Sequence, residues 1–363
     1  MKKIIIKSLA FLPLLFIVVG INYFIDPENF FQSYKFEKGI AEYSLQHKYV
    51  TDIYNYSERK YLKYFITGLK TCPTTAIIGA SRELTLDSTF FTGDYGSLLN
   101  FSMKGATLED EMAIYGIMES YGFQPKEIIL GIEPYFFNSG YNRNTYGPIR
   151  EYYYAVCNQI GMPASKKHER FFKYGHYMQL FSLEYFQKSI LFWVGTGNNH
   201  NYVATSNMFN KNETKCPNGA LVYSESERNI SQAETDALAE KVAYDNTFYI
   251  AENYKALSTE MMLRFEKFVE FLQKKGIKID IVLAPFHPIV YKAIKKMPKY
   301  KMVIAADQYV IAFANRKGIT LFGSLDPAVY GIDNTGFYDE EHLKKWALQK
   351  ILAEPLKEKM KLK

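Results

Sequence analysis

The chain has 363 residues, of which 48% are hydrophobic and 23% are charged, a balance that excludes a disordered or fibrous protein. Its net charge of +6 lies at the two ends, because Lys2, Lys3 and Lys7 contribute +3 and residues 341–363 contribute +4, which leaves −1 for the body. The body therefore has no excess of basic residues for a polyanion, and no nucleic-acid partner is expected.

The first 25 residues predict a membrane anchor. Residues 8–25 contain no charged side chain, and about 18 apolar residues is close to the shortest run that spans a bilayer. Lysines precede this run, whereas Asp26 and Glu28 follow it. This charge order predicts a single-pass protein of the cell membrane with a cytoplasmic N-terminus and an extracytoplasmic C-terminal domain. A signal peptide cleaved near Gly20 is one alternative, and a buried N-terminal helix of a cytosolic protein is another.

Residues 26–73 are expected to form a helical stem. Asp26 ends the apolar run, and Ser57 is the expected N-cap of a helix that carries apolar residues at helical spacing through Leu69. Pro73 then marks a break before the body of the protein.

Residues 74–355 alternate short apolar runs with helix-length segments, which is the pattern of an α/β domain. Buried strands are expected at residues 75–79, 97–102, 127–132, 279–284 and 319–322. Helices are expected at residues 107–121, 258–275 and 300–317, the first of them opened by a capping box at Thr107. Strands separated by helices predict a parallel sheet covered on both faces, a three-layer doubly wound fold.

This alternation is lost in residues 134–257, which we interpret as a long insertion that caps the carboxyl edge of the sheet. Its aromatic residues, among them Tyr152 to Tyr154 and Trp193, have flat faces on which sugar rings can stack; the alternative is that they belong to a core. Residues 356–363 form a short basic tail.

The three cysteines show no metal-binding spacing, so no metal site is expected. Cys157 and Cys216 either form a disulfide in an oxidising compartment or are small core residues, and the second interpretation is favoured.

A serine, a histidine and an aspartate are placed where a catalytic triad can form. Ser81 follows the first predicted strand, and Asp339 and His342 precede the last predicted helix. A doubly wound sheet brings these positions to one edge, where an imidazole can take the serine proton while a carboxylate orients the ring. The spacing of three is expected to place Asp339 and His342 on one helical turn. The alternative for both Ser81 and Asp339 is an ordinary helix N-cap.

This pattern, Gly79-Ala80-Ser81 after the first strand and Asp339-x-x-His342 near the C-terminus, resembles the SGNH (GDSL-like) hydrolase superfamily over about residues 74–355. It is similar in particular to membrane-anchored members that modify bacterial envelope glycans, such as alginate O-acetyltransferases and the D-alanyl transfer protein of teichoic acid synthesis. The resemblance implies Ser81 as nucleophile, His342 as general base and Asp339 as its orienting residue. It also implies a cell-envelope glycan as substrate and a membrane-bound O-acyltransferase as partner.

The oxyanion hole is less complete than the resemblance implies. The backbone N–H groups of Ser81 and Gly105 are the expected donors. The third block of the family supplies an asparagine, but Glu133 occupies that place and an ionised carboxylate cannot donate a hydrogen bond. Asn138 is the nearest replacement in the sequence.

Two further residues have alternative roles. Arg82 is expected either to bind an anionic group of the substrate or to pair with Glu83 or Glu133. His287 follows a strand at the same edge; it is either part of the acceptor site or, as we favour, a structural histidine in a proline-containing turn.

Two functions follow from these residues. The first is a serine-dependent O-acyltransferase or esterase that acts on acyl groups of a cell-envelope polysaccharide and needs no cofactor. The second is a non-catalytic glycan-binding or scaffold subunit with the same fold.

Overall fold

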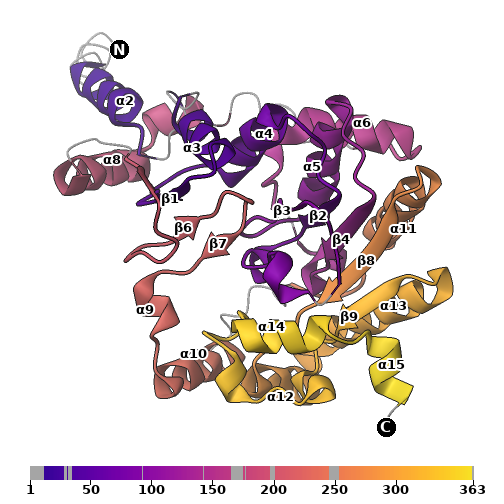
Figure 1. Ribbon diagram of the computed structural model, residues 1–363. Coiled ribbons are helices and arrows are strands. Elements are labelled where there is room, and N and C mark those ends of the chain that lie inside the picture. The colour runs from indigo at the N-terminus through magenta and orange to yellow at the C-terminus, as the bar shows by residue number, and fades with distance from the viewer. Residues whose placement is uncertain are drawn as a thin grey trace, which may run out of the picture.

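The computed structural model describes residues 12–27, 31, 35–91, 93–141, 143–164, 175, 177–196, 201–244 and 253–361 (Figure 1). Its centre is a five-stranded sheet in the order β3-β2-β4-β8-β9, and all neighbouring strands are parallel. The strands are β2 (Thr75–Ile78), β3 (Leu98–Asn100), β4 (Glu127–Gly131), β8 (Lys278–Leu283) and β9 (Thr320–Gly323). All five predicted strands are therefore confirmed, and so is the α/β class with a parallel sheet.

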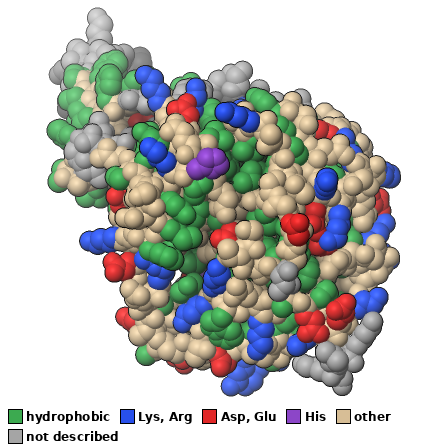
Figure 2. All heavy atoms as spheres, in the orientation of Figure 1, with side chains coloured by type: hydrophobic (Ala, Val, Ile, Leu, Met, Phe, Trp, Pro, Cys, Tyr) green, Lys and Arg blue, Asp and Glu red, His purple; other side chains and the backbone are tan. Residues whose placement is uncertain are grey.

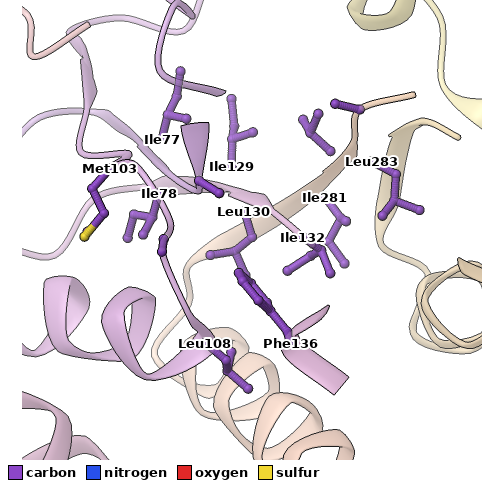
Figure 3. Close-up of a cluster of buried hydrophobic side chains, with 14 of the residues drawn as sticks. Ile77, Ile78, Met103, Leu108, Ile129, Leu130, Ile132, Phe136, Ile281 and Leu283 are labelled. Carbon is purple, nitrogen blue, oxygen red and sulfur yellow. The ribbon is translucent and has the colours of Figure 1, made fainter. Parts of the chain in front are cut away.

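These strands are almost wholly apolar because both faces of the sheet are covered. Ile77 and Ile129 point to one face, whereas Ile78 and Leu130 point to the other, as the two-residue period of a strand requires (Figure 3). All four side chains are fully buried. On the second face Leu130 packs toward Phe136 (Figure 3).

Helices flank the sheet on both sides (Figure 1). The helices α5, α11 and α13 lie on one side, and α14 lies on the other. Their bounds are α5 (Leu108–Ser120), α11 (Thr259–Lys274), α13 (Lys301–Lys317) and α14 (Lys345–Leu352), and α12 (Pro288–Lys296) and α15 (Leu356–Lys361) complete the C-terminal half. The predicted capping box is present, because Thr107 Oγ1 accepts from Asp110 N and Asp110 Oδ2 accepts from Thr107 N.

A second, antiparallel sheet joins two segments that are far apart in the chain. Its strands, in the order β5-β1-β6-β7, are β1 (Tyr49–Thr51), β5 (Val203–Thr205), β6 (Thr214–Lys215) and β7 (Leu221–Val222). Strand β1 belongs to the expected stem, whereas β5, β6 and β7 belong to the expected insertion. Pairing over such a separation has no local sequence signal, and we did not predict this sheet.

The segment expected to form a stem packs onto the main core. It contains α3 (Phe36–Leu45), β1 and α4 (Glu58–Gly68), with Ser57 as the predicted N-cap of α4. Tyr61 and Phe65 of α4 are fully buried in the same hydrophobic cluster as the sheet strands. This segment therefore helps to build the body.

The insertion contains four described helices, α6 (Arg150–Gln159), α8 (Leu183–Thr196), α9 (Glu225–Arg228) and α10 (Gln232–Tyr244). Helix α6 packs against α5 so closely that a Cβ at Gly116 would lie 2.7 Å from the Tyr152 carbonyl oxygen. Tyr153 belongs to the core, which matches the alternative interpretation for that ring. All three cysteines are free thiols, and both Cys157 and Cys216 are buried, so the disulfide did not form.

The apolar N-terminal segment contributes α2 (Leu12–Ile25), a helix of 14 residues. Among the described residues no helix is both long and apolar enough to cross a membrane. Residues 1–11, which include the first part of the predicted anchor, lie outside the described part of the chain.

Candidate functional site

The candidate site lies at the carboxyl ends of β2 and β4. In the sheet order β3-β2-β4-β8-β9, the chain goes from β2 to β3 on one side of it and from β4 to β8 on the other. The connections that leave β2 and β4 therefore run in opposite directions. Ligand crevices of open α/β sheets form at such a switch point. Ser81 follows β2 and Glu133 follows β4.

Ser81 begins a short 3₁₀ helix, η1 (Ser81–Glu83), that is held by a buried carboxylate. Glu83 Oε2 accepts a hydrogen bond of 3.0 Å from Ala80 N. Glycines at 79 and 131 make room for this side chain, since a Cβ at Gly131 would lie 2.3 Å from the Glu83 carboxyl carbon. Burial and the neighbouring Glu133 raise the pKa of Glu83 to about 7, although Arg82 opposes the shift.

The side chain of Ser81 is half-buried, and its hydroxyl has no hydrogen-bond partner among the described residues. In particular, no hydrogen bond joins Ser81 to His342. The two residues are connected indirectly: Leu84, three positions after Ser81, packs in a cluster with Leu221 and Tyr223, and the Tyr223 ring lies 5.8 Å from the His342 ring.

His342 and Asp339, the predicted base and its orienting residue, contact each other directly. His342 Nδ1 lies 2.7 Å from Asp339 Oδ2, and the other carboxylate oxygen accepts from the backbone N–H groups of Glu341 and His342. The expectation of a helical turn was wrong. The residues lie in a loop closed by the antiparallel bridge between Phe337 and Leu343, whose backbone supplies the geometry expected from a helix.

This contact sets the charge of the imidazole. Burial lowers the pKa of His342, but the hydrogen bond and the charge of Asp339, with further contributions from Glu341 and Glu340, raise it to about 9. Burial raises the pKa of Asp339, but the hydrogen bond to His342, the charge of His342 and the backbone N–H groups of Glu341 and His342 together lower it. At neutral pH the pair is therefore an imidazolium beside a carboxylate.

Arg82 and Glu133 form a buried ion pair. Arg82 Nε donates to Glu133 Oε1 over 2.7 Å, its Nη2 donates to the second carboxylate oxygen, and its Nη1 donates to the Ala284 carbonyl. Both side chains are almost fully buried, and the guanidinium stacks over the Phe286 ring. The pairing alternative for Arg82 therefore describes this structure, and Glu133 points at the arginine.

Gly105 lies in the loop after β3, next to β2. Its φ of +57° is in the left-handed region that favours glycine, and a Cβ there would meet open space. Its carbonyl accepts from Arg59, whose guanidinium also binds the Asp110 carboxylate at 2.8 and 3.0 Å. Among the described residues no acceptor contacts the Gly105 N–H. The sequence gives no signal for Arg59 as the residue that holds this loop, because its partners are 45 or more positions away.

Asn138 and His287 lie beside other features. Asn138 lines a hollow of about 270 Å³ with Thr107 and Arg264, and neither Ser81 nor His342 lines it. His287 caps α12 through Nδ1, which accepts from Ile289 N over 3.3 Å, and its backbone N–H donates to the Glu340 carbonyl. The favoured interpretation of His287 as a structural residue fits this placement.

A smaller hollow of about 130 Å³ lies next to the loop that carries His342, and neither His342 nor Ser81 lines it. Tyr223, Tyr338 and Leu343 line it together with the cations Arg228 and Lys345. Tyr223 connects this hollow to the His342 ring. The described residues contain no cluster of His, Cys, Asp and Glu that could hold a metal ion.

Comparisons of the chain with family models, curated proteins and solved structures find no match.

Proposed function

We propose that the chain is a serine-dependent O-acyltransferase or esterase of the SGNH type, acting on acyl groups of an extracytoplasmic cell-envelope polysaccharide. The observation that carries the proposal is the 2.7 Å contact between His342 Nδ1 and Asp339 Oδ2 at the sheet edge where β2 presents Ser81. An oriented imidazole and a serine on a tight turn at a switch point are the parts that acyl transfer needs.

The proposed reaction runs through an acyl-serine. In the neutral form of His342, Nε2 takes the proton of Ser81 while Ser81 Oγ attacks the acyl carbonyl carbon, and Asp339 stabilises the imidazolium that forms. The bond to the leaving oxygen then breaks and that oxygen takes the proton from His342. A glycan hydroxyl or water then attacks the acyl-serine and gives its proton to His342 Nε2. The bond to Ser81 Oγ breaks, and Ser81 takes the proton back from His342. The N–H groups of Ser81 and Gly105 are the proposed oxyanion donors, since Glu133 faces Arg82.

Ser81 and His342 must approach each other for this reaction. Catalytic hydrogen bonds are often long without substrate and tighten when it binds. The hollow lined by Tyr223, next to the His342 ring, has room for a small acyl group. Arg228 and Lys345, together with Asp87, give its lining a net positive charge for an anionic group of donor or acceptor.

The cell membrane is the proposed location, with residues 1–25 as anchor and a membrane-bound O-acyltransferase as the partner that supplies acyl groups. Support comes from the lysines before the apolar run and from the exposed apolar side chains of α2.

The second candidate is a non-catalytic glycan-binding or scaffold subunit. Two observations favour it: Glu133 replaces the family asparagine and pairs with Arg82, and no hydrogen bond joins Ser81 to His342 among the described contacts. Losing one oxyanion donor costs on the order of a hundredfold in rate, so an enzyme with this site would be slow.

A fluorophosphonate probe separates the two candidates. The purified full-length chain is expected to be labelled at Ser81, and Ser81→Ala is expected to abolish the labelling. Ser88 is an exposed serine of the next 3₁₀ helix, η2 (Ser88–Phe90), and Ser88→Ala is the matched control. This variant is expected to be labelled at the same rate as the wild type. Labelling of Ser81→Ala would show that the nucleophile is wrong, and a folded wild type without labelling would favour the scaffold.

A further inference from the structure

Exposed apolar side chains gather on α2 and on the segment around α8. Of the 22 large hydrophobic side chains that are exposed in the described part of the chain, seven belong to α2 and seven to residues 177–194. Both helices project from one corner of the molecule, and hydrophobic side chains cover that corner (Figures 1 and 2). Soluble monomers rarely expose such a continuous apolar surface, so this corner is expected to contact something.

Helix α8 is attached to α2 by buried polar contacts. Asn22 is fully buried, and its Nδ2 donates to the carbonyls of Gln179 at 3.0 Å and Ser182 at 3.1 Å. The Tyr185 hydroxyl donates to Asp26 Oδ1 over 2.8 Å. A buried amide with several partners specifies how two helices pack, so a surface that receives α2 also meets α8.

The two helices run in opposite directions. Ser189 Oγ contacts Asn22 Oδ1 at 3.3 Å, and Tyr185 contacts Asp26, so later residues of α8 lie beside earlier residues of α2. Val18, one turn before Asn22, is buried on the same face of α2. The C-terminal end of α8 therefore lies along the apolar part of α2, and its N-terminal end lies level with Asp26.

The two charged side chains of α8 lie in its first half, although Leu183 beside them is 70% exposed. Glu184 and Lys188 at its start form an ion pair at 3.4 Å. Leu191, Trp193 and Val194 at its end are 72%, 53% and 79% exposed. The charged residues of α8 therefore begin at the level of Asp26, where charge also begins after the apolar run of α2.

We infer that the C-terminal half of α8 inserts into the surface of a lipid bilayer beside α2, with Leu191, Trp193 and Val194 among the acyl chains and headgroups. The inference rests on the membrane attachment proposed above. From Ser189 to Thr196 a helix rises about 10 Å, which matches the depth of interfacial helices. Tryptophan is the side chain that prefers this depth. Trp193 is thus assigned to lipid; in Figure 1 α8 lies at the upper left, whereas α14, which follows His342, lies in the lower part of the molecule.

The two tryptophans of the chain provide the test. Full-length Trp346→Phe protein keeps only Trp193, and full-length Trp193→Phe keeps only Trp346, which is 43% exposed on α14. Each is reconstituted into phosphatidylethanolamine and phosphatidylglycerol vesicles, with or without phosphatidylcholine brominated at carbons 6 and 7. Brominated lipid is expected to quench Trp193 by roughly half, because bromine quenches only at contact depth, and to leave Trp346 unchanged.

A pair of charge substitutions sharpens the assignment. Leu191→Glu with Val194→Glu is expected to abolish the quenching of Trp193, whereas Leu238→Glu, a matched exposed position on α10, is expected to leave it unchanged. Flotation of the same samples distinguishes failures: a chain that does not float with vesicles overturns the attachment itself. A chain that floats while Trp193 is not quenched overturns only the inference for α8. Protection of Trp193 from iodide without bromine quenching would assign the surface to another protein or a second copy, and would also overturn it.

Discussion

Two histidines of this protein face aspartates, and their surroundings make them opposites. His342 lies in the loop before α14, and its Nδ1 is hydrogen-bonded to Asp339 at 2.7 Å. His287 is fully buried at the start of α12, and its Nε2 lies 3.2 Å from Asp236 Oδ1 without the alignment of a hydrogen bond. The pKa of His342 is raised to about 9, whereas burial lowers the pKa of His287.

A nearby carboxylate therefore does not by itself raise the pKa of a histidine. Nδ1 of His287 accepts from the Ile289 N–H, so that ring is fixed as a helix cap and its charged form is disfavoured. His342 has its Nδ1 on the carboxylate, and its Nε2 has no partner among the described residues. A free Nε2 is what a general base requires.

The largest expected effect separates the histidines by activity. His342→Ala is expected to reduce the rate of fluorophosphonate labelling at least about a thousandfold, because the proton acceptor is lost. His287→Ala is expected to reduce the labelling rate less than about tenfold in folded protein, because His287 is hydrogen-bonded to the loop of His342 by its backbone N–H, which donates to the Glu340 carbonyl. Time courses of labelling at fixed probe concentration measure both. Equal losses in two folded variants would contradict the division of roles.

A smaller effect is expected from the aspartates. His342 must be neutral to accept a proton, so with a pKa of about 9 the labelling rate is expected to rise with pH up to about pH 9. Asp339→Asn removes the main contribution that raises this pKa. It is expected to lower the maximal rate on the order of a hundredfold and to move the pH limb downward.

Asp236→Asn is the matched control for that experiment. Its carboxylate faces His287, so the pH limb of labelling is expected to stay near that of the wild type. A limb that moves with Asp236 and not with Asp339 would show that His287 is the titrating base.

The smallest effect concerns stability. His287→Ala is expected to cost about 1 kcal/mol at pH 7 through loss of the α12 cap. The folded pKa of His287 is depressed, so its contribution is complete above the ordinary pKa of 6.5 and is lost as the pH falls through the folded value. Urea unfolding at pH 5 and pH 7 should show a smaller loss on acidification for the variant than for the wild type.

His342 predicts the opposite sign. Its folded pKa is raised from 6.5 to about 9, so its contribution is complete below pH 6.5 and is lost as the pH rises through about 9. Urea unfolding at pH 7 and pH 10 should show that His342→Ala removes part of the alkaline loss of the wild type. If His342→Ala reduced the loss of stability on acidification, and not the loss at alkaline pH, the opposite signs assigned to the two histidines would be contradicted.

Local sequence signals account for much of the fold. The five apolar runs became the five parallel strands, and Ser57 and Thr107 cap helices as expected, because a strand period or a cap involves residues only a few positions apart. The pair Asp339 and His342 was also local, although a loop and not a helix holds it.

Other features of the site had no local signal. Arg59 holds the loop of Gly105 through a hydrogen bond to its carbonyl. Glu133, after β4, forms an ion pair with Arg82, after the neighbouring strand β2. Sequence alone left Arg82 with an anionic substrate or a carboxylate as alternative partners, and the buried bidentate pair decided between them.

The pattern of residues along the chain predicts the α/β class, the five parallel strands, the helices α5, α11 and α13 and the three residues proposed for acyl transfer, since each depends on periodicity, capping or position next to a strand. Three features are visible only in the folded chain: the antiparallel sheet between β1 and the insertion, the partner of Arg82 and the packing of α8 on α2. These contacts join residues that are tens to more than a hundred positions apart, and such pairs form because burying an unpaired polar group is costly, a constraint that no single segment of the sequence displays.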